Sequence, residues 1–175
     1  MITETCLIGH GIPSVSNDEL IERWPSSVPL GMILNGKIEL LSMAEFVPFR
    51  GQALPRYNYF MLDNIPAGTY AFLTASGAMK AAELSGLRWA LSGGLGGIHP
   101  EIRKDTVCPD LYALGNSSVK LLAIAFKDMV DYENIYIVDT LTAVAGIRLL
   151  CEVAINWIDE NRSVENIVSG LEELK

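Results

Sequence analysis

Four glycines and a histidine follow an apolar run in the segment ALSGGLGGIHPE, residues 90–101. Because glycine has no side chain, such a segment either makes a strained turn or lets the main chain approach a ligand closely. Its spacing matches neither the GxGxxG motif nor a P-loop, since no Gly-Lys-Ser/Thr follows. A backbone cradle for an anion and a plain turn are equally compatible with the pattern. The residues here that could contact a ligand are Ser92, Gly93, Gly94, Gly96, Gly97 and His99.

Lys127 follows another apolar run, residues 119–126, and is the candidate nucleophile. Ligands of open α/β sheets bind outside the carboxyl ends of the strands, and this rule selects Lys127 together with His10 and Gly11. A lysine amine becomes a nucleophile near neutral pH when it is desolvated. The alternative is that Lys127 is a solvated surface lysine.

Metal binding through imidazole is not indicated, because His10 and His99 lack HxxxH spacing and no cysteine pairs with either. Carboxylates near the predicted loops offer another possibility. Glu4, Asp105 and Asp110 could hold a hard divalent cation through oxygen. Asp110 could instead cap a short helix.

The first half of the chain carries signals for short elements. Ser16 and Glu19 stand at capping-box spacing and predict the start of a helix. Asn35 and Gly36, between two apolar runs, predict a tight hairpin, and Gly86 predicts the end of a helix. On these signals we expect a strand over 5–10, a helix over 16–24, a hairpin around 35–36, a loop over 46–57 and a helix over 69–85.

The second half contains continuous apolar runs over 87–91 and 119–126, which are typical of strands covered by helices on both faces. The segment 134–138 is either another strand or part of a helix that runs from Lys127. A helix is expected over 140–160. The pattern predicts an α/β fold in a single domain over 1–175, with a mainly parallel sheet covered by helices on both faces. A last amphipathic helix is expected to bury Val164, Ile167, Val168 and Leu171.

The composition of the 175-residue chain argues against several classes of protein. Its formal charge of -8 argues against nucleic acid or an anionic membrane as partner. Cys6, Cys108 and Cys151 include no CxxC pair, so neither a disulfide framework nor a zinc site is indicated, which fits a cytoplasmic protein. The N-terminal residues do not resemble a signal peptide. The apolar window 140–158 carries a polar stripe, which favours a helix packed on a core over a membrane span.

Three segments resemble, in the same order, the pseudouridine-5'-phosphate glycosidases, also called the indigoidine synthase A-like family. They are ETCLIGHGIP (4–13), AELSGLRWALSGGLGGIH (82–99) and PDLYALGNSSVKLLAIAFKDMVD (109–131). The segment PLGMILNGKIEL (29–40) is similar to a hairpin of that family. The resemblance implies the family's fold and its assembly as homotrimers. It also implies reversible cleavage of the C-glycosidic bond of pseudouridine 5'-phosphate, which gives uracil and ribose 5-phosphate.

The resemblance further implies roles for individual residues. Lys127 matches a lysine that forms a Schiff base with the ring-opened sugar, and Glu4 matches a glutamate that acts as acid and base. Asp110 matches an aspartate that helps to hold a divalent metal, usually manganese. The segment 92–99 and Thr74 would contact the sugar or its phosphate. An imine suits this chemistry because it supplies an electron sink for cleavage of a carbon–carbon bond.

The sequence departs from the family pattern at several positions. A phosphate-contacting lysine of the family is absent from FVPFRGQALPR, where Arg50 and Arg56 are the available replacements. Cys108 stands in place of a serine, and Pro100 stands in place of an arginine-like residue. Family members are longer, and replacement helices are expected over 132–175. We therefore expect a shortened, diverged member of the family.

Two other functions fit the same residues. One is a non-catalytic relative that binds a small molecule or assembles as an oligomer. The other is a different Schiff-base enzyme, such as an aldolase-like lyase, which would use Lys127 without contacts to uracil. The leading hypothesis is an enzyme that acts on a sugar phosphate or nucleoside phosphate through Lys127, supported by Glu4 and Asp110.

Overall fold

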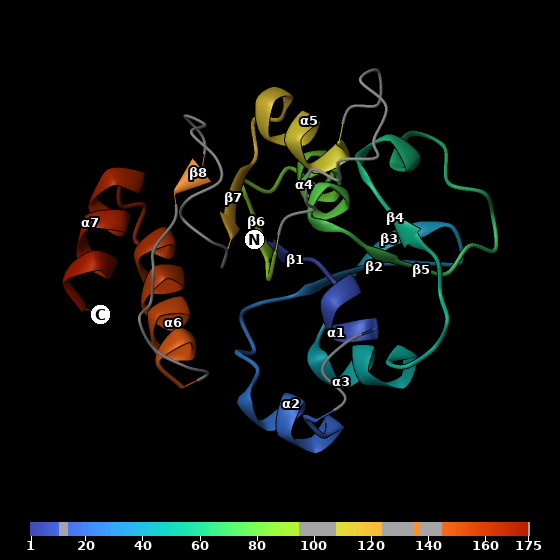
Figure 1. Cartoon of the computed structure of the whole chain (residues 1–175), viewed down its shortest axis with the longest axis horizontal. Helices are drawn as coiled ribbons and strands as arrows, with labels where there is room; N and C mark the ends of the chain where they lie inside the picture. Colours follow the sequence, from blue (N-terminus) through green and yellow to red (C-terminus); the bar gives the residue numbers. More distant parts are fainter. Residues whose placement is uncertain (11–13, 95–107, 124–134, 137–144, 175) are drawn as a thin grey trace.

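The computed structural model describes residues 1–10, 14–94, 108–123, 135–136 and 145–174 (Figure 1). These residues form one mostly parallel sheet with the strand order β4-β5-β2-β1-β6-β7-β8, and β3 pairs with β2. The pairs β1–β2, β1–β6, β6–β7, β7–β8 and β4–β5 are parallel, whereas β2 runs antiparallel to β3 and β5. The strands are β1 (Ile2–Thr3), β2 (Leu30–Leu34), β3 (Lys37–Leu41), β4 (Arg56–Tyr57), β5 (Ala71–Leu73), β6 (Trp89–Ser92), β7 (Lys120–Ala123) and β8 (Ile135–Tyr136).

Helices cover both faces of this sheet, as predicted. In Figure 1, α4 and α5 lie on one side of the strands, and α1, α2 and α3 lie on the other. No described helix combines the length and the apolar character that a bilayer span requires. The helices are α1 (Cys6–His10), α2 (Asn17–Arg23), α3 (Met43–Phe46), α4 (Ala75–Leu84), α5 (Pro109–Asn116), α6 (Ala145–Asp159) and α7 (Val164–Leu174), with the short 3₁₀ helices η1 (Val47–Phe49) and η2 (Tyr59–Asp63).

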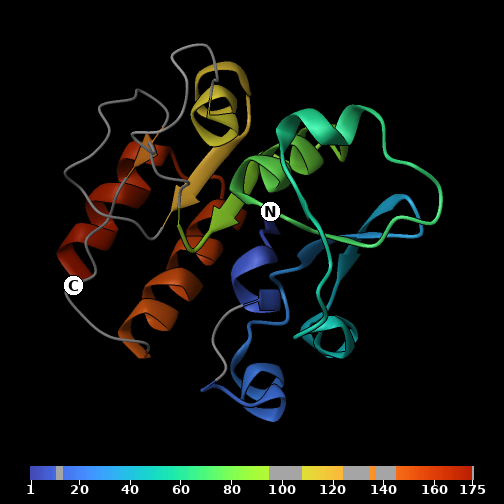
Figure 2. The same cartoon turned by 45° about the vertical axis from the view of Figure 1, so that its right-hand side comes forward.

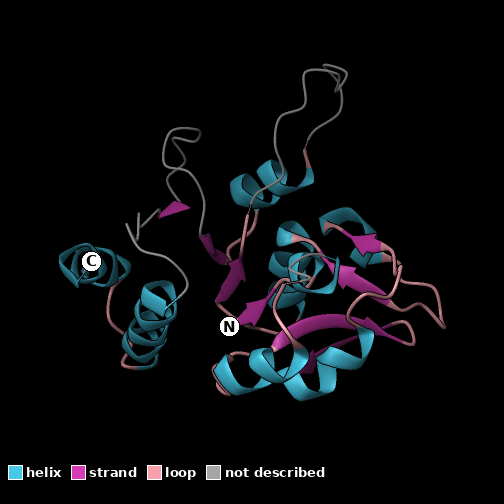
Figure 3. Cartoon of the chain, turned by 60° about the horizontal axis from the view of Figure 1, so that its bottom comes forward, coloured by secondary structure: helices cyan, strands magenta, loops and turns pink. Residues whose placement is uncertain are grey.

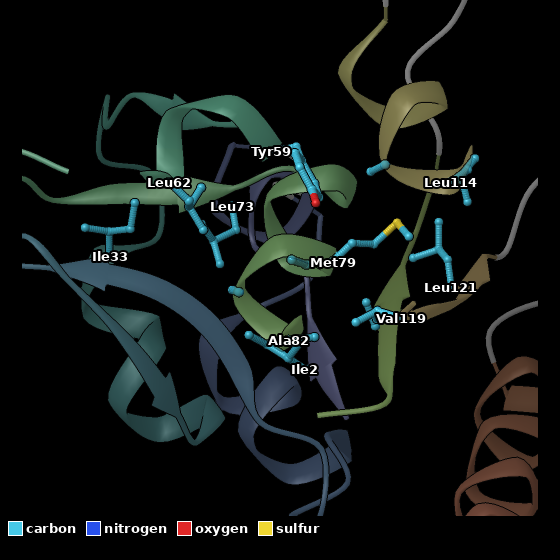
Figure 4. Close-up of a cluster of buried hydrophobic side chains, with 14 of the residues drawn as sticks. Ile2, Ile33, Tyr59, Leu62, Leu73, Met79, Ala82, Leu114, Val119 and Leu121 are labelled. Atoms are coloured by element: carbon cyan, nitrogen blue, oxygen red, sulfur yellow. The ribbon is translucent and has the colours of Figure 1, made fainter. Parts of the chain in front are cut away.

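Alternating side chains of the strands divide the core into clusters on the two faces of the sheet. Ile33 and Leu73 belong to the cluster beneath α4 and α5, which Figure 4 shows. Their neighbours Met32 and Phe72 belong to the opposite cluster, where they pack with Phe46 of α3. The central strands therefore bury both faces, which explains why their sequences are continuously apolar.

Helices α6 and α7 pack together at the β7 end of the sheet (Figures 2 and 3). Leu122 of β7 contacts their cluster, whereas the adjacent Leu121 faces the other way. The predicted amphipathic face of α7 is confirmed: Val164, Ile167 and Leu171 are buried, and Val168 is half-buried.

Local turn and cap signals are confirmed. Asn35 and Gly36 have φ angles of 51° and 81° and join β2 to β3 in the predicted hairpin. Ser16 caps α2 by accepting a hydrogen bond from the Glu19 N–H at 3.2 Å. Gly86 has a φ angle of 68° just after α4, where the helix was expected to end.

The strand predicted over 5–10 is wrong, because residues 6–10 form α1 and the strand ends at Thr3. The buried Thr5 hydroxyl donates to the Gly31 carbonyl at 2.8 Å and accepts from the Leu73 N–H at 2.9 Å. The Gly9 N–H then donates to the Thr5 carbonyl at 2.8 Å. Thr5 thus connects three strands while its own carbonyl begins a helical turn.

The loop predicted over 46–57 and the helix predicted over 69–85 also need correction. Pro48 stands in the first turn of η1, a position that tolerates a residue without an N–H. Strand β4 then ends the supposed loop by pairing with β5, and residues 71–73 of the supposed helix are that β5 strand. The helical part begins only after Thr74, whose hydroxyl accepts from the Gly77 N–H at 3.2 Å.

The strands predicted over 87–91 and 119–126 correspond to β6 and β7, and 134–138 contains the strand β8. The part of the second run beyond residue 123 lies outside the described residues. The helix expected over 140–160 corresponds to α6, which begins at Ala145.

Candidate functional site

A pocket of about 390 Å³ lies where β1, β5 and β6 end and α4 and α5 begin. Glu4 follows β1, Thr74 follows β5, and Gly93 and Gly94 follow β6. Asp110, in the first turn of α5, completes this part of the wall. Five of the residues that the sequence analysis named therefore line one pocket at the carboxyl ends of the strands, where ligands of such sheets bind.

Glu4 is the buried acid of this pocket, with 7% of its surface exposed. Its Oε1 accepts a hydrogen bond from the Gly93 N–H at 2.9 Å. Burial raises the pKa of Glu4 to about 7; hydrogen bonds from Gly93 and Ser92 oppose that rise, and the charge of Asp110 adds to it. A carboxyl with such a pKa can give and accept a proton near neutral pH.

Asp110 is also buried, with 9% of its surface exposed. Its Oδ1 accepts from the Ser76 N–H at 3.0 Å, in the first turn of α4. A negative charge is favoured there because the N-terminus of a helix carries free N–H groups and a partial positive charge. The sequence left open whether Asp110 caps a short helix; the structure places Asp110 inside α5, after the N-cap Cys108, and its carboxylate accepts from the first turn of α4.

The glycine segment is described only as far as Gly94. Ser92 does not line the pocket, but its buried hydroxyl accepts from the Gly94 N–H at 3.1 Å and so fixes the start of the segment. An added Cβ at Gly93 would lie only 2.5 Å from Leu7 Cδ2, the tip of an exposed side chain that would have to turn aside. The other nominated residues, Gly96, Gly97, His99 and Lys127, lie outside the described residues.

Four further side chains line the pocket, from Cys6, Leu7, His10 and Arg56. The sequence had already singled out His10, and had named Arg56 as one of two replacements for a missing lysine. It missed Cys6 and Leu7, because residues 5–10 were assigned to a strand. Burial raises the pKa of the Cys6 thiol to about 12, so this side chain stays protonated at neutral pH.

A metal site was expected at Asp110. Within the described part of the chain, no group of three or more His, Cys, Asp or Glu side chains is placed to hold an ion. The oxygen atoms of Asp110, Glu4 and Thr74 nevertheless share one pocket. Such a donor set fits a hard divalent cation that keeps several of its water ligands.

No protein-family model matches the chain. A pseudouridine-5'-phosphate glycosidase of Herpetosiphon aurantiacus is 27% identical over 140 residues, and one of Caldanaerobacter subterraneus is 28% identical over 139 residues. Both matches cover 73% of this chain. The chain is a diverged relative of the pseudouridine-5'-phosphate glycosidases. The matches cover 46% and 45% of these two glycosidases, so the chain spans about half the length of the curated relatives it matches.

Solved structures confirm the fold expected of this glycosidase relative. An indigoidine synthase A-like protein from Thermotoga maritima aligns with a TM-score of 0.57 and 21% identity, over 70% of this chain and 44% of that protein. The prealnumycin C-glycosynthase AlnA, crystallised with ribulose 5-phosphate, aligns with a TM-score of 0.56 and 21% identity, over 75% of this chain and 46% of AlnA. The architecture is therefore that of the indigoidine synthase A-like proteins.

Proposed function

We propose that this chain makes or breaks a C-glycosidic bond of a sugar phosphate, with Lys127 forming an imine and Glu4 transferring protons. The names of the curated relatives and of AlnA support this reaction class. The observation that carries the proposal is the buried Glu4, which has a pKa of about 7 in a pocket that also contains Asp110.

In the direction of synthesis, the proposed reaction begins at the amine of Lys127. The Lys127 amine adds to the aldehyde carbon of a ring-opened pentose phosphate, and water leaves as the imine forms. A ring carbon of the second substrate adds to the imine carbon and gives its proton to the Glu4 carboxylate. The 4-hydroxyl of the sugar then displaces the amine: the C–O bond forms as the C–N bond breaks, the leaving nitrogen takes the proton held by Glu4, and the hydroxyl gives its own proton to solvent, which restores the proton taken up when the imine was protonated. Cleavage is the reverse.

Trapping of the imine tests this proposal. Borohydride added with ribose 5-phosphate should attach to the wild-type chain the mass of one pentose phosphate less one oxygen atom. The Lys127→Ala variant should give no adduct, because it lacks the amine. Lys120→Ala is the matched control, since Lys120 lies at the start of β7 over the Trp89 ring, and it should react like the wild type.

Two outcomes would count against the enzyme. An adduct that survives Lys127→Ala would assign the imine to another amine. If no pentose phosphate gives an adduct while the chain still binds one, the protein is the non-catalytic binding relative that the sequence also allowed.

We further propose that Asp110, with oxygen ligands from Glu4 or Thr74 and water, holds a divalent cation, manganese in the first place. The ion would supply positive charge to polarise a substrate oxygen. Assembly as a trimer and a cytoplasmic location remain predictions from the sequence.

A thermal-shift measurement tests the metal site. Manganese should raise the melting temperature of the wild type, because an ion that binds only the folded state stabilises it. Asp110→Asn should abolish the shift. Asparagine keeps an oxygen that can accept from the Ser76 N–H, so the variant should still fold. An unchanged manganese shift in this variant would place the ion elsewhere.

A further inference from the structure

Ser76 is a fully buried serine in the first turn of α4 that contacts two residues of the pocket wall. Its backbone N–H donates to Asp110 Oδ1 at 3.0 Å, and its hydroxyl oxygen lies 3.1 Å from the hydroxyl oxygen of Thr74. Asp110 and Thr74 line the pocket, whereas Ser76 lies behind them. The side chain of Ser76 can therefore act on a ligand through Thr74.

The polarity of Thr74 follows from a count of its hydrogen bonds. A hydroxyl group has one proton to donate and two lone pairs that accept. Thr74 Oγ1 accepts from the Gly77 N–H at 3.2 Å, so one lone pair is used to cap α4. In the contact between Thr74 and Ser76, either oxygen can be the donor. What Thr74 presents to the pocket thus depends on which of the two hydroxyl groups donates.

The surroundings of Ser76 decide the direction of this hydrogen bond. The Ser76 oxygen accepts from the Tyr59 N–H at 3.4 Å, and Thr74 Oγ1 is its other partner. If Thr74 donated, the Ser76 proton would have no acceptor among the described residues and, with none of the residue exposed, no access to solvent. Because a buried hydroxyl without an acceptor costs free energy, Ser76 donates to Thr74.

With Ser76 as the donor, both lone pairs of Thr74 Oγ1 are used, one by the Gly77 N–H and one by the Ser76 hydroxyl. Only the Thr74 proton is left, and within the described part of the chain it has no acceptor. An oxygen without a free lone pair cannot coordinate a cation, because metal ions bind through lone pairs. Thr74 thus offers the pocket a hydrogen-bond donor, next to the carboxyl groups of Glu4 and Asp110.

We propose that Ser76 is a positioning residue, which by donating to Thr74 makes the Thr74 hydroxyl a donor to an oxygen atom of the ligand and excludes Thr74 from coordinating a metal ion. The choice of a sugar phosphate as the ligand rests on the function proposed above, whereas the arrangement of the two protons does not. Of the oxygen ligands proposed for the cation, Asp110 and Glu4 remain.

Neutron diffraction locates the two hydroxyl hydrogen atoms directly, as deuterons after exchange into D₂O. We expect one deuteron on Ser76 Oγ that is directed at Thr74 Oγ1, and a second on Thr74 that is directed into the pocket. A deuteron that belongs to Thr74 and points at Ser76 would overturn the proposal, because Thr74 would then face the pocket with a lone pair. This measurement needs neither a ligand nor activity.

Calorimetry with ribitol 5-phosphate, which has no aldehyde and cannot form an imine, measures the contact with the ligand. Thr74→Val should weaken binding about 3- to 10-fold, as expected for one lost hydrogen bond, and Thr74→Ser should restore it. Ser76→Ala should weaken binding about 2- to 5-fold, because it keeps the N–H that holds Asp110 but leaves the Thr74 hydroxyl free to turn. Ser85→Ala, at the exposed end of α4, is the matched control and should bind like the wild type.

A double-mutant cycle separates positioning from a merely structural role. If Ser76 acts through Thr74, Ser76→Ala should have no further effect on ribitol 5-phosphate binding in a chain that already carries Thr74→Val. Additive losses would remove the positioning role of Ser76. The ligand contact is rejected if Thr74→Val leaves the affinity unchanged or if the wild type does not bind the probe.

Manganese tests the exclusion of Thr74 from the metal site. Thr74→Val should leave the manganese-induced rise in melting temperature as large as in the wild type. A loss of that rise would make Thr74 a metal ligand and overturn the proposal. A failed imine-trapping experiment with an intact double-mutant cycle would reject the enzyme and leave the roles of Thr74 and Ser76 standing.

Discussion

Glu4→Gln should make the protein more stable at pH 8 by about 3 kcal/mol, while reducing activity by about 10²- to 10⁴-fold. The pKa of Glu4 is about 7 in the folded chain and 4.5 as the ordinary value. The native state therefore binds more protons than the unfolded state between these two pH values, and wild-type stability falls as the pH rises through that window. Glutamine never ionises, and its oxygen can still accept from the Gly93 N–H.

Urea unfolding in the presence of a chelator measures the effect. The difference in free energy of unfolding between Glu4→Gln and the wild type should be small near pH 4 and grow until about pH 8. Glu39→Gln, on the exposed part of β3, is the control and should change stability by no more than about 0.5 kcal/mol at either pH. A difference that does not vary with pH would show that Glu4 is not held in a desolvated site.

Gly77→Ala should destabilise the fold by about 3 kcal/mol. Gly77 lies in the first turn of α4, and a Cβ at this position would overlap the backbone carbonyl of Tyr57 in β4. Backbone cannot rotate away as a flexible side chain can, so β4 would have to move. The gain in helix propensity from alanine is below about 1 kcal/mol and cannot offset the overlap.

Chemical denaturation of Gly77→Ala and Gly115→Ala gives the comparison. Gly115 lies in α5, where an added Cβ meets nothing within 4 Å, so alanine there should be neutral or slightly stabilising. Wild-type stability in Gly77→Ala would mean that β4 and α4 are not in close contact.

The elements that the sequence predicted correctly are those decided by local chemistry. Asn35 and Gly36 adopt positive φ angles that few other residues tolerate, and Ser16 satisfies a helix N–H three residues away. The runs 87–91 and 119–126 were recognised because a strand buried on both faces needs no polar residues. These signals act within a few residues of their positions, so one sequence suffices to find them.

The wrong assignments involve segments whose partners are distant in the sequence. Residues 71–73 have a composition that suits a helix and become a strand by pairing with β2 and β4. Residues 6–10 become a helix because Thr5 is held by Gly31 and Leu73. Tertiary contacts decide both segments, and local propensity does not reveal them.

In the pocket, too, local signals could be found from the sequence, whereas contacts between distant segments could not. The strand-end rule predicted ligand contacts just after β6, where Gly93 and Gly94 line the pocket, and the family resemblance supplied Glu4 and Asp110. Neither could show that Asp110 caps α4, because a cap from another helix leaves no spacing signal in the sequence. The sequence also could not show that Arg56 lines the pocket while Arg50 donates to Asn17 instead, because this difference lies in what surrounds each arginine.

The position of β1 has a consequence for how the chain folds. Its two residues lie in the middle of the sheet, where Ile2 pairs with Ala90 and Thr3 pairs with Leu91 and Leu30. During synthesis these residues leave the ribosome long before β6 does, and such non-local pairing slows folding. Glu4 comes directly after β1. The acid of the pocket therefore reaches its place only when β1 pairs with β6, about ninety residues later in the chain.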